Sequence, residues 1–219
     1  MATQGTIQLT QPVSERDHIR GPHGAEVSLV EYGDFECPYC RAAEPIVAGL
    51  IEALGDRLSV TFRHFPLSQV HSHAWHAAEV AEAAASQGKF WEMHDTLFAR
   101  QDALDDADLL KYAAELSLDS DRVSRELAGH EYARRVEEDQ QSGLDSRVSG
   151  TPTFYIDGSR YDGSVALRDM LAKIRQLHPD LEPGDTAATN PRIPRVRWPV
   201  RSGRWPGEEI DRDRKSTPA

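Results

Sequence analysis

Cys37 and Cys40 are the only cysteines of the 219-residue chain, and Pro38 and Tyr39 separate them. A disulfide between residues so close in sequence closes a very short loop, which adds little to the stability of a fold. Two thiols at this spacing are better suited to reversible thiol–disulfide exchange or to binding a metal ion. The pair therefore predicts either a redox site or a zinc site.

A strand followed by a helix is expected to position the two thiols. Residues 27–32 are rich in strand-forming side chains, and residues 41–54 carry apolar side chains at helical spacing. Cys37 then lies at the helix N-terminus, where free N–H groups and the helix dipole favour a thiolate. Pro38 suits the first helical position, and Cys40 lies one turn further in. We therefore expect Cys37 to attack a disulfide and Cys40 to resolve the mixed disulfide.

Two further features fit this chemistry. Glu31 lies in the expected strand, six residues before Cys37. A half-buried carboxylate there would accept the proton of Cys40, although the side chain could instead point to solvent. Thr151–Pro152 is a candidate cis peptide, because only X–Pro bonds adopt cis at low cost. Facing the thiols, it would leave the Thr151 backbone free to pair with an extended substrate.

The remaining pattern predicts an α/β fold. Residues 58–64 alternate as a second strand parallel to the first, residues 71–145 are helical, and residues 146–178 hold two strands and an amphipathic helix. Residues 1–25 are an N-terminal segment. Residues 179–219 contain seven of the 13 prolines and predict an extended or disordered tail.

Composition and charge narrow the classes of function. The net charge of −11 argues against nucleic acid as a partner, because phosphate binding needs a basic surface. Apolar stretches stay well short of the roughly 20 residues that cross a bilayer, so no membrane insertion is expected. The polar start of the chain does not have the pattern of a secretory signal, which predicts a cytoplasmic protein.

Four separated motifs resemble those of bacterial DsbA-like thioredoxin-fold oxidoreductases, over about residues 15–178. They are EYGDFECPYC (31–40), FRHFPL (62–67), GKFWEMH (88–94) and GTPTF (150–154). RDHIRGP (16–22) is also similar to modules fused behind sodium/proton antiporters. The resemblance implies a thioredoxin fold in two parts, residues 26–70 and 146–178, interrupted by the helical insertion.

The same resemblance implies roles for the site residues. It implies a nucleophilic Cys37, a resolving Cys40, Glu31 at a buried-acid position and Pro152 at the cis-proline position. Protein thiols and disulfides would be the substrates, without a cofactor, and a membrane transporter or a redox protein is a candidate partner. The direction of electron flow stays open. The expected substrate contacts are Pro38, Tyr39 and Thr151.

Three other interpretations compete with thiol exchange. The two cysteines could form a zinc site with His71 and His73, or with His64. The cysteine pair could act as a redox sensor that switches contacts of the tail or of a transporter, without turnover. A cysteine hydrolase with His64 or His94 as the base is disfavoured, because the second thiol would trap the nucleophile as a disulfide.

Overall fold

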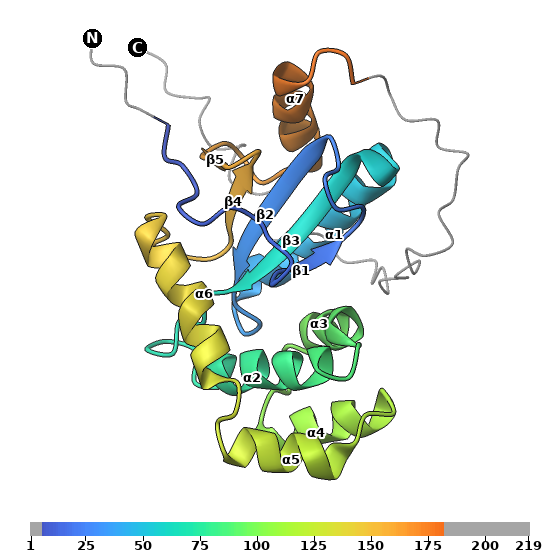
Figure 1. The fold of residues 1–219 in the computed structure, drawn as a ribbon, viewed down its shortest axis with the longest axis vertical. Helices are drawn as coiled ribbons and strands as arrows, with labels where there is room; N and C mark the ends of the chain where they lie inside the picture. The colour runs from blue at the N-terminus through green and yellow to red at the C-terminus, as the bar shows by residue number, and fades with distance from the viewer. Residues whose placement is uncertain (1–5, 182–219) are drawn as a thin grey trace, which may run out of the picture.

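The computed structural model describes residues 6–181, and its centre is a five-stranded mixed sheet (Figure 1). The strand order is β1-β3-β2-β4-β5. β2 and β3 are parallel, and every other neighbouring pair is antiparallel. The strands are β1 (His18–Arg20), β2 (Val27–Gly33), β3 (Leu58–His64), β4 (Thr153–Ile156) and β5 (Ser159–Tyr161).

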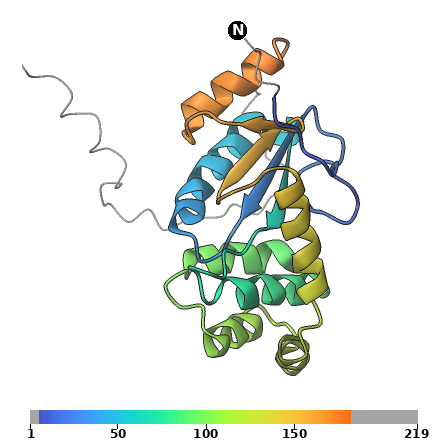
Figure 2. The same cartoon turned by 90° about the vertical axis from the view of Figure 1, so that its left-hand side faces the viewer.

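Helices cover both faces of the sheet and extend beyond one end of it (Figure 2). α1 and α7 lie together on one face, α6 lies on the other, and α2 to α5 form a helical layer beyond the end of β3. The helices are α1 (Pro38–Leu54), α2 (Ala74–Ala85), α3 (Phe90–Ala99), α4 (Asp106–Glu115), α5 (Ser120–Ala128), α6 (Ala133–Asp145) and α7 (Leu167–Leu177).

β2 and β3 are buried along nearly their whole length, which explains why their sequences are apolar with little alternation. α1 connects β2 to β3, as the strand–helix–strand pattern predicts. Its apolar stripe, including Val47 and Leu50, packs on Leu29, Val60 and the buried side of α7. This packing fixes the N-terminus of α1 at the end of β2, where the cysteines lie.

Gly33 ends β2 at the point where the backbone passes a ring of β3. A Cβ at Gly33 would lie 2.3 Å from Cε2 of Phe62, so glycine is required for this approach. The chain then turns through Asp34 and enters α1 after Cys37. This close packing brings the end of β2 against the stacked rings of Phe35 and Phe62, which belong to the core beneath the helical layer.

Several features differ from or add to the sequence expectations. β1 lies within the segment taken as N-terminal and pairs antiparallel with the edge of β3. α6, part of the expected helical insertion, contacts both α2 and β3 and so joins the two layers. In residues 6–181 no helix is long and apolar enough to cross a membrane. The predicted tail lies outside the described residues from position 182 onward.

Candidate active site

Cys37 is the residue immediately before α1. Its backbone is extended (φ −73°, ψ 120°), and Pro38 occupies the first turn of the helix, where no N–H donor is needed. The Cys37 carbonyl accepts the first helical hydrogen bonds, from Cys40 N at 3.1 Å and Arg41 N at 3.2 Å. Pro38 is exposed, and Tyr39 is 74% exposed, so both extend from the surface beside the thiol.

A segment distant in sequence, at Thr151 and Pro152, also reaches the Cys37 sulfur. The protonated Cys37 Sγ donates to the Thr151 carbonyl at 3.3 Å, and the Thr151–Pro152 peptide is cis. Gln101, which no sequence motif indicated, donates to the Cys37 carbonyl at 2.9 Å and to the Phe35 carbonyl at 2.7 Å. The loop before α1 is therefore held from two sides.

The two thiols have opposite electrostatic environments. The hydrogen bond from the Cys40 thiol, with further ones from Thr151 and the backbone N–H groups of Cys40 and Tyr39, lowers the pKa of Cys37 to about 5 against the effect of burial. Burial, the contact with Cys37 and the charge of Glu31 raise the pKa of Cys40 well above its ordinary value. At neutral pH Cys37 is a thiolate and Cys40 is protonated.

Glu31 lies beneath this pair and points into the protein rather than to solvent. Glu31 is only 2% exposed, and its Oε1 atom has no hydrogen-bond partner within the described structure. Burial, followed by the charge of Cys37, raises the pKa of Glu31 to about 8. A carboxyl group that titrates near neutrality is suited to proton transfer.

The sequence pattern that defines the thioredoxin family matches residues 13–176, which is most of the chain. The chain is a member of the thioredoxin family. The match includes the strand β2, the cysteine pair, the helical layer and the segment around Pro152. The resemblance seen in the sequence is thereby confirmed, and so is the expected α/β fold with a helical insertion.

Solved structures place this thioredoxin-family chain among DsbA-like folds. BdbD of Bacillus subtilis superposes with a TM-score of 0.69 at 20% identity, covering 78% of this chain and 97% of that one. DsbA1 of Wolbachia pipientis superposes with a TM-score of 0.66 at 18% identity, covering 79% and 96%. At such identities the likeness establishes the fold, which is that of DsbA-like thiol–disulfide oxidoreductases.

The similar curated sequences carry a different name. The Na⁺/H⁺ antiporter NhaA 3 of Salinispora tropica is 51% identical over 176 residues, which are 79% of this chain and 26% of that protein. The antiporter NhaA of Herminiimonas arsenicoxydans is 44% identical over 165 residues, again 26% of its length. This thioredoxin-family chain thus spans about a quarter of the length of the antiporters that it matches.

Of the four histidines considered as zinc ligands or bases, His64, His71 and His94 have other side-chain partners. His71 Nδ1 lies 2.8 Å from Asp34 Oδ2, and His64 Nε2 lies 2.8 Å from Glu82 Oε1. His94 Nδ1 lies 3.0 Å from Asp95 Oδ1. Within residues 6–181, none of the clusters of His, Cys, Asp and Glu with metal-ligand spacing includes a cysteine. The zinc interpretation therefore has no ligand set around the thiols. The three clusters are His18–His64–Glu82, His76–Glu79–His130 and Glu44–His94–Asp95.

The low pKa of Cys37 leads to a testable pH profile. We expect the iodoacetamide alkylation rate of Cys37 to be constant from pH 7 to pH 6 and to fall as the pH drops through about 5. Cys40→Ala removes the hydrogen bond that contributes most and should move this midpoint upward, whereas Cys40→Ser keeps a donor and should move it less. Rates measured between pH 3.5 and 9 by mass spectrometry would check this. A midpoint near 8.5 in the wild type would contradict it.

Proposed function

We propose that the protein is a dithiol–disulfide oxidoreductase acting on protein thiols, with Cys37 as the attacking and Cys40 as the resolving residue. The observation that carries the proposal is the asymmetry of the two thiols. Cys37 is at the N-terminus of α1 with its pKa lowered to about 5, and Cys40 is fully buried with its pKa raised. A site that only binds a metal or braces a fold does not require this difference.

Reduction of a substrate disulfide proceeds in two steps, and oxidation of a substrate dithiol follows the same steps in reverse. The Cys37 thiolate attacks a substrate disulfide, forming a mixed disulfide and releasing one substrate thiolate. Once Glu31 has lost its own proton, Cys40 passes its proton to the Glu31 carboxylate and attacks the Cys37 sulfur, which releases the second substrate thiolate. In the mixed disulfide Cys37 is uncharged, so one of the two causes that raise the pKa of Glu31 is gone and the carboxylate forms more readily.

The preferred direction follows from the same asymmetry. Hydrogen bonds that stabilise the Cys37 thiolate exist only in the reduced protein, so they stabilise the reduced form relative to the disulfide. A couple whose reduced form is stabilised accepts electrons more readily. We therefore propose that the protein favours oxidation of substrate dithiols.

Substrate contact is assigned to the surface around the Cys37 sulfur. The exposed rings of Pro38 and Tyr39 flank the thiol on one side, and Thr151 and Pro152 flank it on the other. The Thr151 carbonyl lies 3.3 Å from the Cys37 sulfur, so a peptide that pairs with this backbone would lie beside the thiolate. The cytoplasmic location expected from the sequence stays a prediction.

Trapping with Cys40→Ser tests the proposed function. Without a resolving thiol, mixed disulfides through Cys37 should accumulate and should resist everything except an added reductant. The wild type should also catalyse the reduction of insulin by dithiothreitol, which provides turnover with a protein substrate. If neither trapped species nor insulin reduction occurs, the enzymatic proposal fails.

A second candidate function is a redox-sensing module that serves a transporter. The similar curated proteins favour it, because they are named Na⁺/H⁺ antiporters and this chain matches about a quarter of their length. In this version the state of the cysteine pair changes a contact with the transporter, and turnover is secondary.

Truncation after Leu181 would separate the two candidate functions. Leu181 is buried against the packing of α1 and α7, so the cut should follow it. Loss of co-purification with a membrane antiporter, with insulin reduction unchanged, would support sensing through residues 182–219. Unchanged insulin reduction without any dependence of the contact on redox state would favour the enzyme alone.

A further inference from the structure

The buried carboxyl group of Glu31 lines a small cavity, and neither cysteine lines it. The cavity has a volume of about 10 Å³. This is close to the roughly 10–15 Å³ of free space that one water molecule needs. Its polar lining comes from four different elements, and apolar side chains close the rest. The lining residues are Arg20, Glu31, Glu44, Val47, Ile51, Val60, Phe62, Trp91 and His94.

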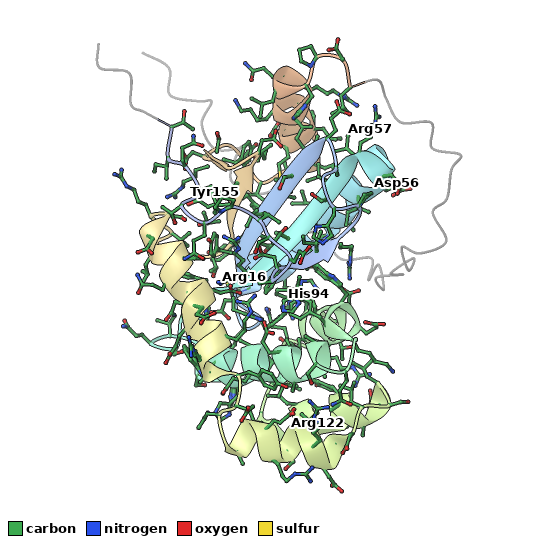
Figure 3. All side chains as sticks on the ribbon, in the orientation of Figure 1. Arg16, Asp56, Arg57, His94, Arg122 and Tyr155 are labelled. Carbon is green, nitrogen blue, oxygen red and sulfur yellow. The ribbon has the colours of Figure 1, made fainter. Side chains whose placement is uncertain are left out.

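Two further proton-binding groups share this cavity with Glu31. Glu44 lies on α1, one turn beyond Cys40, and is 5% exposed. His94 lies on α3 and is 3% exposed, and Figure 3 shows it where the helical layer meets the sheet. The His94 Nε2 atom is 3.9 Å from Glu44 Oε1, a separation that a small movement or one bridging water closes.

The environment of His94 fixes which of its nitrogens faces the acids. Nδ1 lies 3.0 Å from Asp95 Oδ1, so it carries the hydrogen and Nε2 presents its lone pair toward Glu44. Asp95 in turn accepts two hydrogen bonds from Arg20 Nη2, both at 2.9 Å. Burial lowers the pKa of His94 to about 4, with Asp95 opposing and Arg20 and His64 adding to the effect.

A proton must leave Glu31 during each oxidation of the cysteine pair. The reduced protein holds one proton on Cys40 and, at neutral pH, one on Glu31, whose pKa is about 8. The disulfide form retains only the one on Glu31. Since Cys40 is fully buried and Glu31 is 2% exposed, that proton has no direct contact with solvent at the thiols.

We propose that His94 and Glu44 form the proton exit of Glu31, so that His94 is a positioning and proton-transfer residue for resolution by Cys40. Glu44, which is protonated, accepts the Glu31 proton across the cavity as it gives its own proton to the Nε2 of His94. From His94 the proton reaches solvent beside Asp95 and Arg20, whose side chains are 16% and 15% exposed. This inference rests on the proposed thiol exchange and adds the route by which its proton balance is kept.

The experiment measures the two chemical steps separately in His94→Gln and Glu44→Gln. Reduced protein is mixed with glutathione disulfide in a stopped-flow instrument, and tryptophan fluorescence follows attack and then resolution. Glu44→Gln keeps shape and neutral charge, because burial, Glu31 and Asp95 hold the pKa of Glu44 well above its usual range. We expect resolution at pH 7 to slow at least about tenfold in each variant, while the attack by Cys37 stays within about twofold.

The pH profile distinguishes proton transfer from packing. In both variants the Glu31 proton must leave to hydroxide, so the resolution rate should rise about tenfold per pH unit. The wild type should level off below pH 8, because the Cys37 charge that helps to raise the pKa of Glu31 is absent from the mixed disulfide. His64→Gln is the matched control. His64 is also buried, at 1% exposed, and contacts the same Phe35 and Phe62 rings as His94, but it does not line the cavity.

The outcomes separate this inference from the proposed function. Wild-type resolution rates in both His94→Gln and Glu44→Gln overturn the exit route, while normal attack by Cys37 in the same samples leaves the thiol exchange intact. An equal slowing in His64→Gln also overturns it, because packing alone would then explain the effect. If the wild type forms no mixed disulfide, the exchange itself fails and the exit route fails with it.

Discussion

Cys37→Ser should reduce catalysed insulin reduction by at least about a thousandfold, to the rate of dithiothreitol alone. A serine hydroxyl in the same position is not ionised at neutral pH and does not form a disulfide, so both the attack and the covalent intermediate are lost. The fold should be unaffected, since Cys37 precedes α1 and Pro38 still begins the helix. Turbidity of precipitating insulin B chain measures the rate.

Cys40→Ser is the matched control for this loss. It removes the second thiol at the same site but leaves the Cys37 thiolate, so single-step exchange with a chromogenic disulfide should continue while turnover of insulin stalls. Residual insulin reduction above background in Cys37→Ser would show that another group carries the chemistry. No cysteine besides these two is present in the chain.

Arg63→Ala should lower the free energy of unfolding by about 3–5 kcal/mol, the cost of leaving one member of a buried ion pair without its partner. Arg63 Nε donates to Asp17 Oδ1 at 2.8 Å, and Nη2 donates to Asp17 Oδ2 at 3.1 Å. Nη1 donates to the Tyr32 hydroxyl at 3.0 Å. The Arg63 and Asp17 side chains are 3% and 0% exposed. Urea unfolding at pH 7 would measure the loss.

The double variant Asp17→Leu with Arg63→Met should recover part of this loss, because two apolar side chains leave no buried charge. The pH dependence has a definite sign. Burial alone would raise the pKa of Asp17, but the Arg63 hydrogen bond and charge outweigh it, and the net pKa is lowered. The stabilisation is therefore complete above the unfolded pKa of about 3.9 and is lost as the pH falls below it. Equal stabilities of wild type and Arg63→Ala at pH 7 would contradict the assignment.

The elements around the thiols could be predicted because their signals are local. The apolar run of β2, the helical spacing of α1 and the proline after Cys37 each act over a few residues, and the structure has these elements within a few residues of the expected bounds. The cysteine spacing then led to the proposed thiol exchange. Glu31 was expected to be half-buried and is fully buried, because side chains of α1 and α3, among them Glu44 and His94, enclose it.

The parts that could not be predicted depend on contacts between distant segments. β1 has three residues, two of them charged or polar, and is a strand only because the edge of β3 is available to it. His94 was considered only as a base for Cys37, since nothing in the sequence indicates that α3 would bring it to Glu44. Gln101 holds the Cys37 loop from a turn after α3, at a distance of 64 residues in sequence.

The order of the strands has a consequence for the proposed exchange while a substrate is bound. Thr151 and Pro152 lead into β4 on one side of β2, whereas Arg20 belongs to β1, on the other side beyond β3. A protein substrate docked over Cys37 and Thr151 therefore covers the β4 side and leaves the β1 edge open to water. In the proposed exchange, electrons and protons therefore pass through different surfaces, so a large substrate does not have to dissociate before the buried acid exchanges its proton.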